Sequence, residues 1–208
     1  MKKSRGKIRI LIFVLGGLAA IGPFSIDMYL PGFAEIAGGL NTSMAMVGYS
    51  LTAYFFGICF GQLIYGPVTD RFGRKIPLLT GLAIYMISSI GCALVSGING
   101  LIILRATQAL GGCVGMVASR AVVRDVFPVA MTAKIFSSLM LVMGVAPIIA
   151  PTVGGIVTSA FGWRVIFWVL ALFGAFMFIC VVCFLDETKT PDPSVSLHPA
   201  TVFVNYFE

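Results

Sequence analysis

Six apolar runs, each long enough to cross a bilayer, constrain the fold of this 208-residue chain most strongly. They cover residues 9–30, 44–67, 76–96, 99–121, 134–159 and 164–185. A bilayer core needs about 20 apolar residues per helix, and only helices or closed barrels satisfy the backbone there. The chain is 59% hydrophobic and 11% charged, which is too much apolar surface for one soluble core of its size. The sequence therefore predicts an all-α integral membrane protein with six transmembrane helices.

The basic residues are distributed unevenly between the two sides of these runs. With the N-terminus inside, Arg164 lies on the outer side and Arg105 lies within the fourth run. The other twelve lie on the inner side: Lys2, Lys3, Arg5, Lys7, Arg9, Arg71, Arg74, Lys75, Arg120, Arg124, Lys134 and Lys189. This asymmetry follows the positive-inside rule and predicts that both ends of the chain are cytoplasmic. The net charge of +6 therefore does not indicate a nucleic-acid partner.

The polar residues form no catalytic or metal-binding set in the sequence. The single histidine, His198, lies in a polar tail, and the five cysteines lie within apolar runs. Cys180 and Cys183 form a C-x-x-C, which we interpret as small apolar residues on a helix and not as a redox or metal site. We expect no enzyme, no metal and no cofactor.

A charged turn separates the second and third runs. Gly66 and Pro67 are expected to end the second helix, and Gly73 to supply a turn with positive φ. Asp70 either accepts bonds from free amides at the next helix start or pairs with Arg71 or Arg74. A simple topology anchor would explain the basic residues but not the acid and the glycines. The candidate loop is Gly66, Asp70, Arg71, Gly73, Arg74 and Lys75.

Two ionisable residues lie inside the apolar runs. Asp27 follows a Gly-Pro pair in the first helix, which we expect to end at Pro31. Arg105 lies about one turn into the fourth run, on one helix face with Gln108. Ionisable groups at membrane depth mark functional sites. The alternatives are that Asp27 sits in the outer headgroups and that Arg105 snorkels to the interface. A pairing between Asp27 and Arg105 is geometrically possible.

Two further segments carry patterned residues. After the fourth helix, Arg120, Arg124 and Asp125 predict an inner-face charge network with Asp70, because arginines one turn apart repel unless they are partnered. The fifth helix carries a stripe of small residues and prolines, which indicates close helix packing and a kink. The stripe is Gly144, Pro147, Pro151, Gly154 and Gly155.

Taken together, these motifs resemble the major facilitator superfamily. The charged turn fits its loop pattern G-x-x-x-D-R-x-G-R-[KR], and residues 105–111 resemble R-x-x-Q-[GA]-x-G, with Ala109 at the variable position. Residues 146–155 read A-P-x-x-A-P-x-x-G-G and resemble the antiporter motif G-P-x-x-G-G, with Ala150 in place of its first glycine. Residues 27–31, D-M-Y-L-P, resemble the first helix of the Bcr/CflA drug-efflux branch.

The resemblance implies a twelve-helix fold whose two halves, each built of inverted three-helix repeats, rock by alternating access. Residues 1–190 would form the N-terminal half, and residues 191–208 would begin the central cytoplasmic linker, with the C-terminal half absent. The resemblance also implies that Asp27 and Arg105 serve proton coupling, that the charged turn acts as an inner gate, and that the antiporter motif indicates efflux.

We therefore interpret the chain as the N-terminal half of a proton-driven exporter of bicyclomycin- or chloramphenicol-type drugs in a bacterial inner membrane. The proton gradient supplies the energy. The expected partners are protons, the bilayer, a missing second half or a second copy, and a hydrophobic or amphipathic drug. The drug would contact Tyr29, Tyr54, Phe55 and Gln108. The alternatives are an importer of a small metabolite, a non-transporting assembly partner and an inactive half-transporter fragment.

Overall fold

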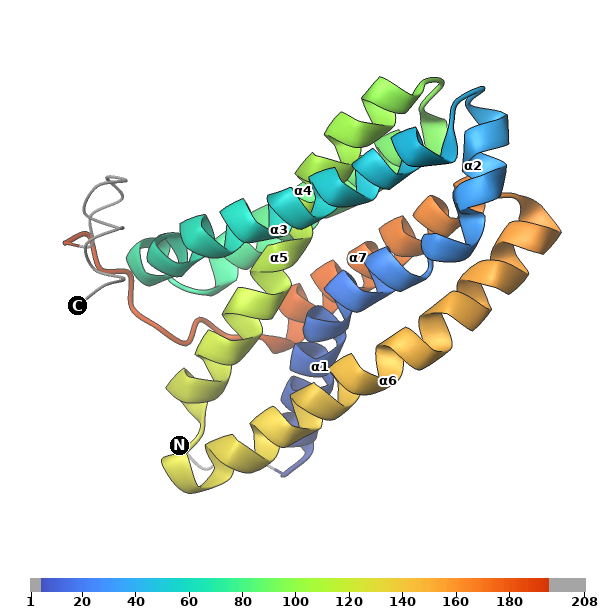
Figure 1. The fold of residues 1–208 in the computed structure, drawn as a ribbon. Helices are drawn as coiled ribbons and strands as arrows, with labels where there is room; N and C mark the ends of the chain where they lie inside the picture. Colours follow the sequence, from blue (N-terminus) through green and yellow to red (C-terminus); the bar gives the residue numbers. More distant parts are fainter. Residues whose placement is uncertain (1–4, 195–208) are drawn as a thin grey trace.

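Six long helices dominate the computed structural model, which describes residues 5–194 (Figure 1). All six are long and apolar enough to cross a membrane, which confirms the predicted fold class. The predictions for Lys2, Lys3, His198 and residues 195–208 lie outside the described residues. The long helices are α1 (Arg5–Asp27), α3 (Met44–Phe72), α4 (Lys75–Leu94), α5 (Ile98–Val126), α6 (Val129–Phe161) and α7 (Arg164–Phe184).

The connection between α1 and α3 differs from the prediction. It contains a 3-10 turn, η1 (Leu30–Gly32), and a short helix, α2 (Phe33–Gly39), where a loop was expected. α1 ends at Asp27, not at Pro31. An α-helix running on would need the N–H of residue 31 to bond the carbonyl of Asp27, and proline has none. Pro31 therefore ends the helix four residues before its own position.

α3 continues through Pro67 to Phe72, so the prediction that Gly66 and Pro67 end this helix is wrong. Proline removes only one intrahelical bond, and membrane helices tolerate this when nearby side chains bond the freed groups. The carbonyl that Pro67 frees is that of Leu63, four residues earlier, and the helix continues on its remaining bonds. The helix ends at Gly73, whose φ of 83° is the expected positive value.

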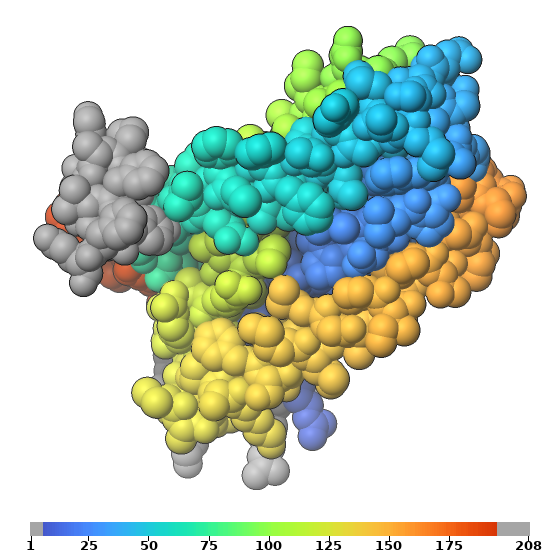
Figure 2. Space-filling view, viewed as in Figure 1, coloured from blue at the N-terminus to red at the C-terminus, as the bar shows by residue number. Residues whose placement is uncertain are grey.

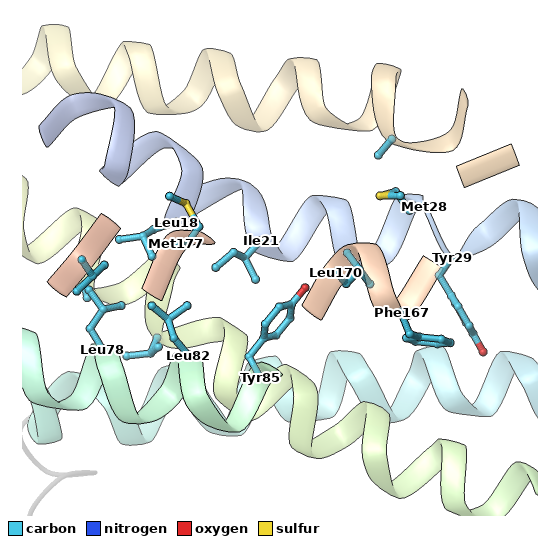
Figure 3. Close-up of a cluster of buried hydrophobic side chains, with 14 of the residues drawn as sticks. Leu18, Ile21, Met28, Tyr29, Leu78, Leu82, Tyr85, Phe167, Leu170 and Met177 are labelled. Atoms are coloured by element: carbon cyan, nitrogen blue, oxygen red, sulfur yellow. The ribbon is translucent and has the colours of Figure 1, made fainter. Parts of the chain in front are cut away.

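α1 and α5 form the centre of the bundle. α5 packs on α3 and α4, α1 packs on α6 and α7, and the two central helices contact each other. This pattern maps onto itself when α1, α3 and α4 are exchanged with α5, α6 and α7, as expected for two three-helix repeats. The core side chains labelled in Figure 3 come from α1, the turn after it, α4 and α7.

α3 and α6 are the least buried of the long helices, with 28% and 17% of their most apolar windows inside the protein. Figure 2 shows the face on which parts of α1 (blue) and α5 (yellow-green) lie between α3 (cyan) and α6 (orange). We call the end of the bundle with the α3–α4 and α5–α6 turns the basic end. It carries nearly all the described basic residues.

Candidate functional site

Arg105 lies fully buried, about 10 Å along α5 from its start. No part of the side chain reaches the surface, so the snorkelling alternative is wrong. A buried guanidinium is costly unless its donors and its charge are compensated. The contacts around Arg105 therefore show what this part of the bundle is built to hold.

Three aromatic rings from separate segments of the chain surround the guanidinium carbon. It lies 4.2 Å from the ring centroid of Tyr54 on α3, 4.4 Å from that of Tyr29 after α1, and 5.8 Å from that of Phe167 on α7. Tyr29 and Phe167 lie side by side in Figure 3, with centroids 5.8 Å apart. Ring faces within about 6 Å attract a cation, more strongly where water is excluded. We call this arrangement the arginine cage.

Two neutral oxygens accept hydrogen bonds from the guanidinium. Nη1 donates to the Gln108 Oε1 at 2.7 Å, and Nη2 donates to the backbone carbonyl of Ser25 at 3.0 Å. Ser25 lies in the last turn of α1, where carbonyls lack donors within the helix. Arg105 therefore caps α1, and its positive charge faces the negative end of the helix dipole. The Arg105 Nε has no acceptor among residues 5–194.

Hydroxyl groups extend the cage onto α4. The Gln108 Nε2 donates to the Ser89 Oγ at 2.7 Å, and the hydroxyls of Ser25 and Tyr85 are 2.7 Å apart. The sequence analysis did not predict these contacts of the third membrane helix. Serine and tyrosine at packing positions carry no sequence pattern that marks them as members of a polar network.

Asp27 is close to the cage in sequence but faces elsewhere. Its flanking residues Ser25 and Tyr29 both contact Arg105, whereas Asp27 forms no hydrogen bond or ion pair within the described residues. Residues two apart on a helix do not share a face, whereas residues four apart do. Asp27 is partly exposed, and the pairing with Arg105 that we considered possible is not made.

Arg74, in the α3–α4 turn, is the second buried arginine, and it is neutralised by acids. Its Nε donates to the Asp125 Oδ2 at 2.8 Å, and its Nη1 lies 2.9 Å from the Asp70 Oδ1. Lys189, after α7, donates to the same Asp70 oxygen at 2.6 Å. We call this group the Arg74 network. It provides the expected link between the α3–α4 turn and the end of α5, and it adds the segment after α7.

Glu187 caps the start of α4, a role that the sequence analysis offered to Asp70. Its carboxylate accepts from the backbone N–H of Arg74 at 2.7 Å and of Lys75 at 3.1 Å. Asp70 instead takes the other predicted alternative, the pair with Arg74. The signal for Glu187 was an acid directly after the sixth apolar run, on the same side as the charged turn.

The other predicted residues of the basic end lie outside the Arg74 network. Arg120 and Arg124 are exposed and form no ion pair within residues 5–194. The Arg71 guanidinium lies 5.8 Å from the centroid of the Phe72 ring. The Nζ of Lys75 donates to the carbonyl of Val182 at 3.2 Å. Of the predicted inner-face charges, the structure brings Asp70, Arg74 and Asp125 together.

The stripe on α6 meets the end of α1 only through its last residues. A Cβ at Gly154 would overlap the backbone of Met28, and one at Gly155 would lie 3.8 Å from the Cβ of Pro31. Figure 3 shows Met28 between α1 and α6. A Cβ at Gly144 would meet nothing within 4 Å, Pro147 is exposed and Pro151 is partly buried. Gly154 therefore sets how closely α6 approaches the segment that carries Asp27 and Tyr29.

The four predicted substrate contacts separate into two groups. Tyr29, Tyr54 and Gln108 belong to the arginine cage, whereas Phe55 is 47% exposed on α3.

Within residues 5–194 there is no group of three or more His, Cys, Asp or Glu side chains that could hold a metal ion.

Three curated bacterial relatives match most of this chain and about half of their own length. A protein of Bacillus subtilis (strain 168) named "Uncharacterized MFS-type transporter YdgK" is 45% identical over 88% of this chain and 46% of its own. A "Bicyclomycin resistance protein homolog" of Haemophilus influenzae is 34% identical over 95% of this chain and 50% of its own. The "Multidrug resistance protein MdtL" of Escherichia coli O139:H28 is 33% identical over 88% and 46%.

Solved structures show the same fold at low identity. The proton:xylose symporter XylE aligns with a TM-score of 0.79 and 14% identity, over 89% of this chain and 46% of its own. The family model of the Major Facilitator Superfamily matches residues 12–204. With six membrane-length helices over about half the length of the curated relatives it matches, the chain belongs to the Major Facilitator Superfamily of multi-pass membrane transporters, which are not enzymes.

Proposed function

We propose that this chain is the N-terminal half of a proton-coupled antiporter that exports drugs. The observation that carries the proposal is the arginine cage, in which a buried cation has only neutral acceptors among the described residues. Two of its contacts, Ser25 and Tyr29, lie two positions before and after the carboxylate of Asp27. The names of the bicyclomycin and multidrug resistance relatives support drug export, as does the antiporter-type stripe on α6.

Asp27 is the proposed proton carrier. When it is ionised, its charge is attracted to Arg105, and a rearrangement of the end of α1 that turned Asp27 toward α5 would bring the two side chains together. Protonation removes that attraction and favours the arrangement described here, in which Arg105 bonds Ser25 and Gln108. Proton entry would therefore bias one state of the bundle over another, and this bias can drive export.

The proposed substrate is a hydrophobic or amphipathic small molecule. It would enter between α3 and α6, on the face shown in Figure 2. Both helices have exposed apolar side chains, and Phe55 of α3 is one of them. The second half of the transporter, or a second copy of this chain, would close that face. The basic residues favour a cytoplasmic basic end in a bacterial inner membrane.

The test is drug accumulation in efflux-deficient bacteria that express this chain or the same reading frame extended downstream, with and without a proton uncoupler. We expect the extended form to lower accumulation, and the uncoupler to abolish the effect. Asp27→Asn should remove the dependence of export on external pH. Glu35→Gln, which changes an acid at the same end of the bundle, should leave that dependence intact. Full coupling in Asp27→Asn would contradict the proposed carrier, and uptake in place of export would favour an importer.

A further inference from the structure

Two hydrogen-bonded hydroxyl pairs attach the end of α1 to other helices, one on each side of Asp27. The Oγ of Ser25 and the hydroxyl oxygen of Tyr85 on α4 are 2.7 Å apart. The hydroxyl oxygen of Tyr29 and the Oγ of Ser50 on α3 are 2.6 Å apart. All four side chains are buried. The two residues that flank the carboxylate are therefore each held from outside α1.

The direction of both hydrogen bonds follows from the single proton of a serine hydroxyl. The Ser25 Oγ donates to the carbonyl of Ile21 at 2.7 Å, and the Ser50 Oγ donates to the carbonyl of Val47 at 2.6 Å. Neither serine then has a proton left for its tyrosine, so each tyrosine hydroxyl is the donor. A phenylalanine in place of Tyr85 would therefore remove one bond and keep the ring.

The ring of Tyr85 is fixed by close packing between α5 and α7. A Cβ at Gly112 on α5 would lie 2.9 Å from the Tyr85 Cδ2, and one at Gly174 on α7 would lie 2.8 Å from its Cδ1. Opposite edges of the ring thus contact different helices, and Figure 3 shows the side chain extending from α4 toward α1. Close-packed surroundings leave such a ring little room to move. The Tyr85 hydroxyl therefore fixes where the Ser25 side chain lies.

Both pairs oppose any movement that turns Asp27 toward α5. Ser25 and Tyr29 are four residues apart and share the side of the α1 end that now contacts Arg105. Asp27 is two residues from each of them and faces elsewhere. Turning Asp27 toward α5 would carry both neighbours off that side. The two hydroxyl pairs would then break, together with the bond from Arg105 to the Ser25 carbonyl.

We propose that Tyr85 and Ser50 are positioning residues, which hold Asp27 away from Arg105 by fixing the residues on either side of it. This inference rests on the proposed role of Asp27 as proton carrier. The two pairs stabilise the arrangement that a protonated Asp27 favours, and they are lost in the arrangement in which the ionised side chain reaches Arg105. They therefore affect how readily Asp27 releases its proton, although neither pair includes it.

The titratable groups around these two pairs come from α3, α4 and α5. They are Tyr54, Cys92 and Arg105. α6 and α7 carry their titratable groups near the helix ends, at Lys134, Arg164, Cys180 and Cys183. Arg164 donates to the carbonyl of Val95 at 3.0 Å, and Glu35 of α2 accepts from the backbone N–H of Trp163 at 3.1 Å. Arg105 is thus the charge to which ionised Asp27 would be drawn.

The test is chemical labelling of Asp27 at a series of pH values, in the purified 208-residue chain in detergent. Dicyclohexylcarbodiimide adds to protonated carboxyl groups in apolar surroundings, and peptide mass spectrometry measures the labelled fraction. In Tyr85→Phe and in Ser50→Ala the pH of half-maximal labelling should fall by about half a pH unit to one pH unit, because the proton-bound arrangement loses a hydrogen bond. Tyr49→Phe removes the same group from an exposed position on α3 and should leave the midpoint unchanged.

Three results in the variants would overturn the proposal. An unmoved midpoint combined with lower thermal stability would make the two pairs purely structural. A midpoint that rises would mean that the pairs favour the ionised form. An equal shift in Tyr49→Phe would mean that the loss of any tyrosine hydroxyl has this effect. If Tyr85→Phe does not fold, Ser25→Ala replaces it, because it removes the acceptor of the same bond, and an unmoved midpoint there counts equally against the proposal.

The wild-type chain separates failure of this inference from failure of the proposed function. Labelling of Asp27 that does not depend on pH in the wild type would refute the proton carrier, and this inference with it. Labelling that depends on pH in the wild type, with midpoints that do not move in the variants, would refute only the role of Tyr85 and Ser50.

Discussion

The bundle buries two arginines and neutralises them in opposite ways. Arg105, within the membrane span, has two neutral oxygens and three ring faces, whereas Arg74, at the basic end, has two carboxylates. The Arg74 network is therefore close to electrically neutral, and it joins the α3–α4 turn, the end of α5 and the segment after α7. The arginine cage keeps a net positive charge.

The difference matters because a buried pair and an unpaired buried charge respond differently to change. Removing one member of an ion pair leaves the other charge uncompensated, and this destabilises a protein strongly. Removing a charge that has no ionic partner also removes its desolvation cost. The Arg74 network is thus suited to hold the fold together, and the arginine cage to respond to a nearby charge.

Replacing Arg105 with Met should have the largest effect of the changes considered. The effect on transport should exceed the effect on stability. Export by the extended reading frame should fall about 1,000-fold, because two charge-assisted hydrogen bonds are lost. The free energy of unfolding should change by less than about 1 kcal/mol, since loss of the buried charge offsets the lost bonds. Drug accumulation and thermal unfolding in detergent measure the two effects. Export that persists would make the cage purely structural.

Replacing Arg74 with Met should have the opposite profile. The unfolding free energy should fall by about 3 kcal/mol, because Asp70 and Asp125 are left without their shared partner. Arg124→Met, at an exposed arginine of the same end, should change it by less than about 0.5 kcal/mol. Adding Asp70→Asn and Asp125→Asn to Arg74→Met should recover most of the loss. A triple variant as unstable as the single one would refute the ion-pair explanation.

Replacing Gly154 with Ala tests whether α6 positions the segment beside the arginine cage. The new methyl group would overlap the Met28 backbone, so stability should fall by about 2 kcal/mol. Gly144→Ala, on the same helix with open space around it, should raise stability by up to about 1 kcal/mol through helix propensity. Chemical denaturation of the two variants should therefore shift in opposite directions. Shifts of the same sign would mean that the contact with Met28 relaxes at little cost.

Replacing Glu187 with Gln should have the smallest effect. It removes the negative charge at the start of α4 and leaves one acceptor oxygen where the amides of Arg74 and Lys75 now use two. Stability should fall by about 1 kcal/mol at low salt and by less at high salt, where the helix dipole is screened. Asp192→Asn, an exposed acid beyond α7, is the control and should show no salt-dependent loss. A loss that salt does not reduce would point to changed hydrogen bonding and not to charge.

The pattern of residues in the sequence was enough to predict the six long helices and several of their contacts. Apolar length predicted six spans. Gly57 and Gly61 form a G-x-x-x-G, which is typical of close helix approach, and a Cβ at either glycine would collide with α5. These are local properties, since the bilayer requires each segment to satisfy its own backbone. Pro67 misled the prediction because the loss of one N–H removes a single intrahelical bond and does not by itself end a long membrane helix.

The partners of the charged residues were decided only in three dimensions. The sequence marked Arg105 and Asp27 as unusual, and helical spacing placed Gln108 beside Arg105. It did not indicate that Ser25, Tyr54 and Phe167 would surround the guanidinium, or that Asp27 would face away from it. Glu187 likewise reaches the start of α4 across more than 100 residues of chain. The membrane spans follow from the chemistry of each segment. The neutralisation of a buried charge depends instead on which helices pack together, and only the tertiary structure determines that packing.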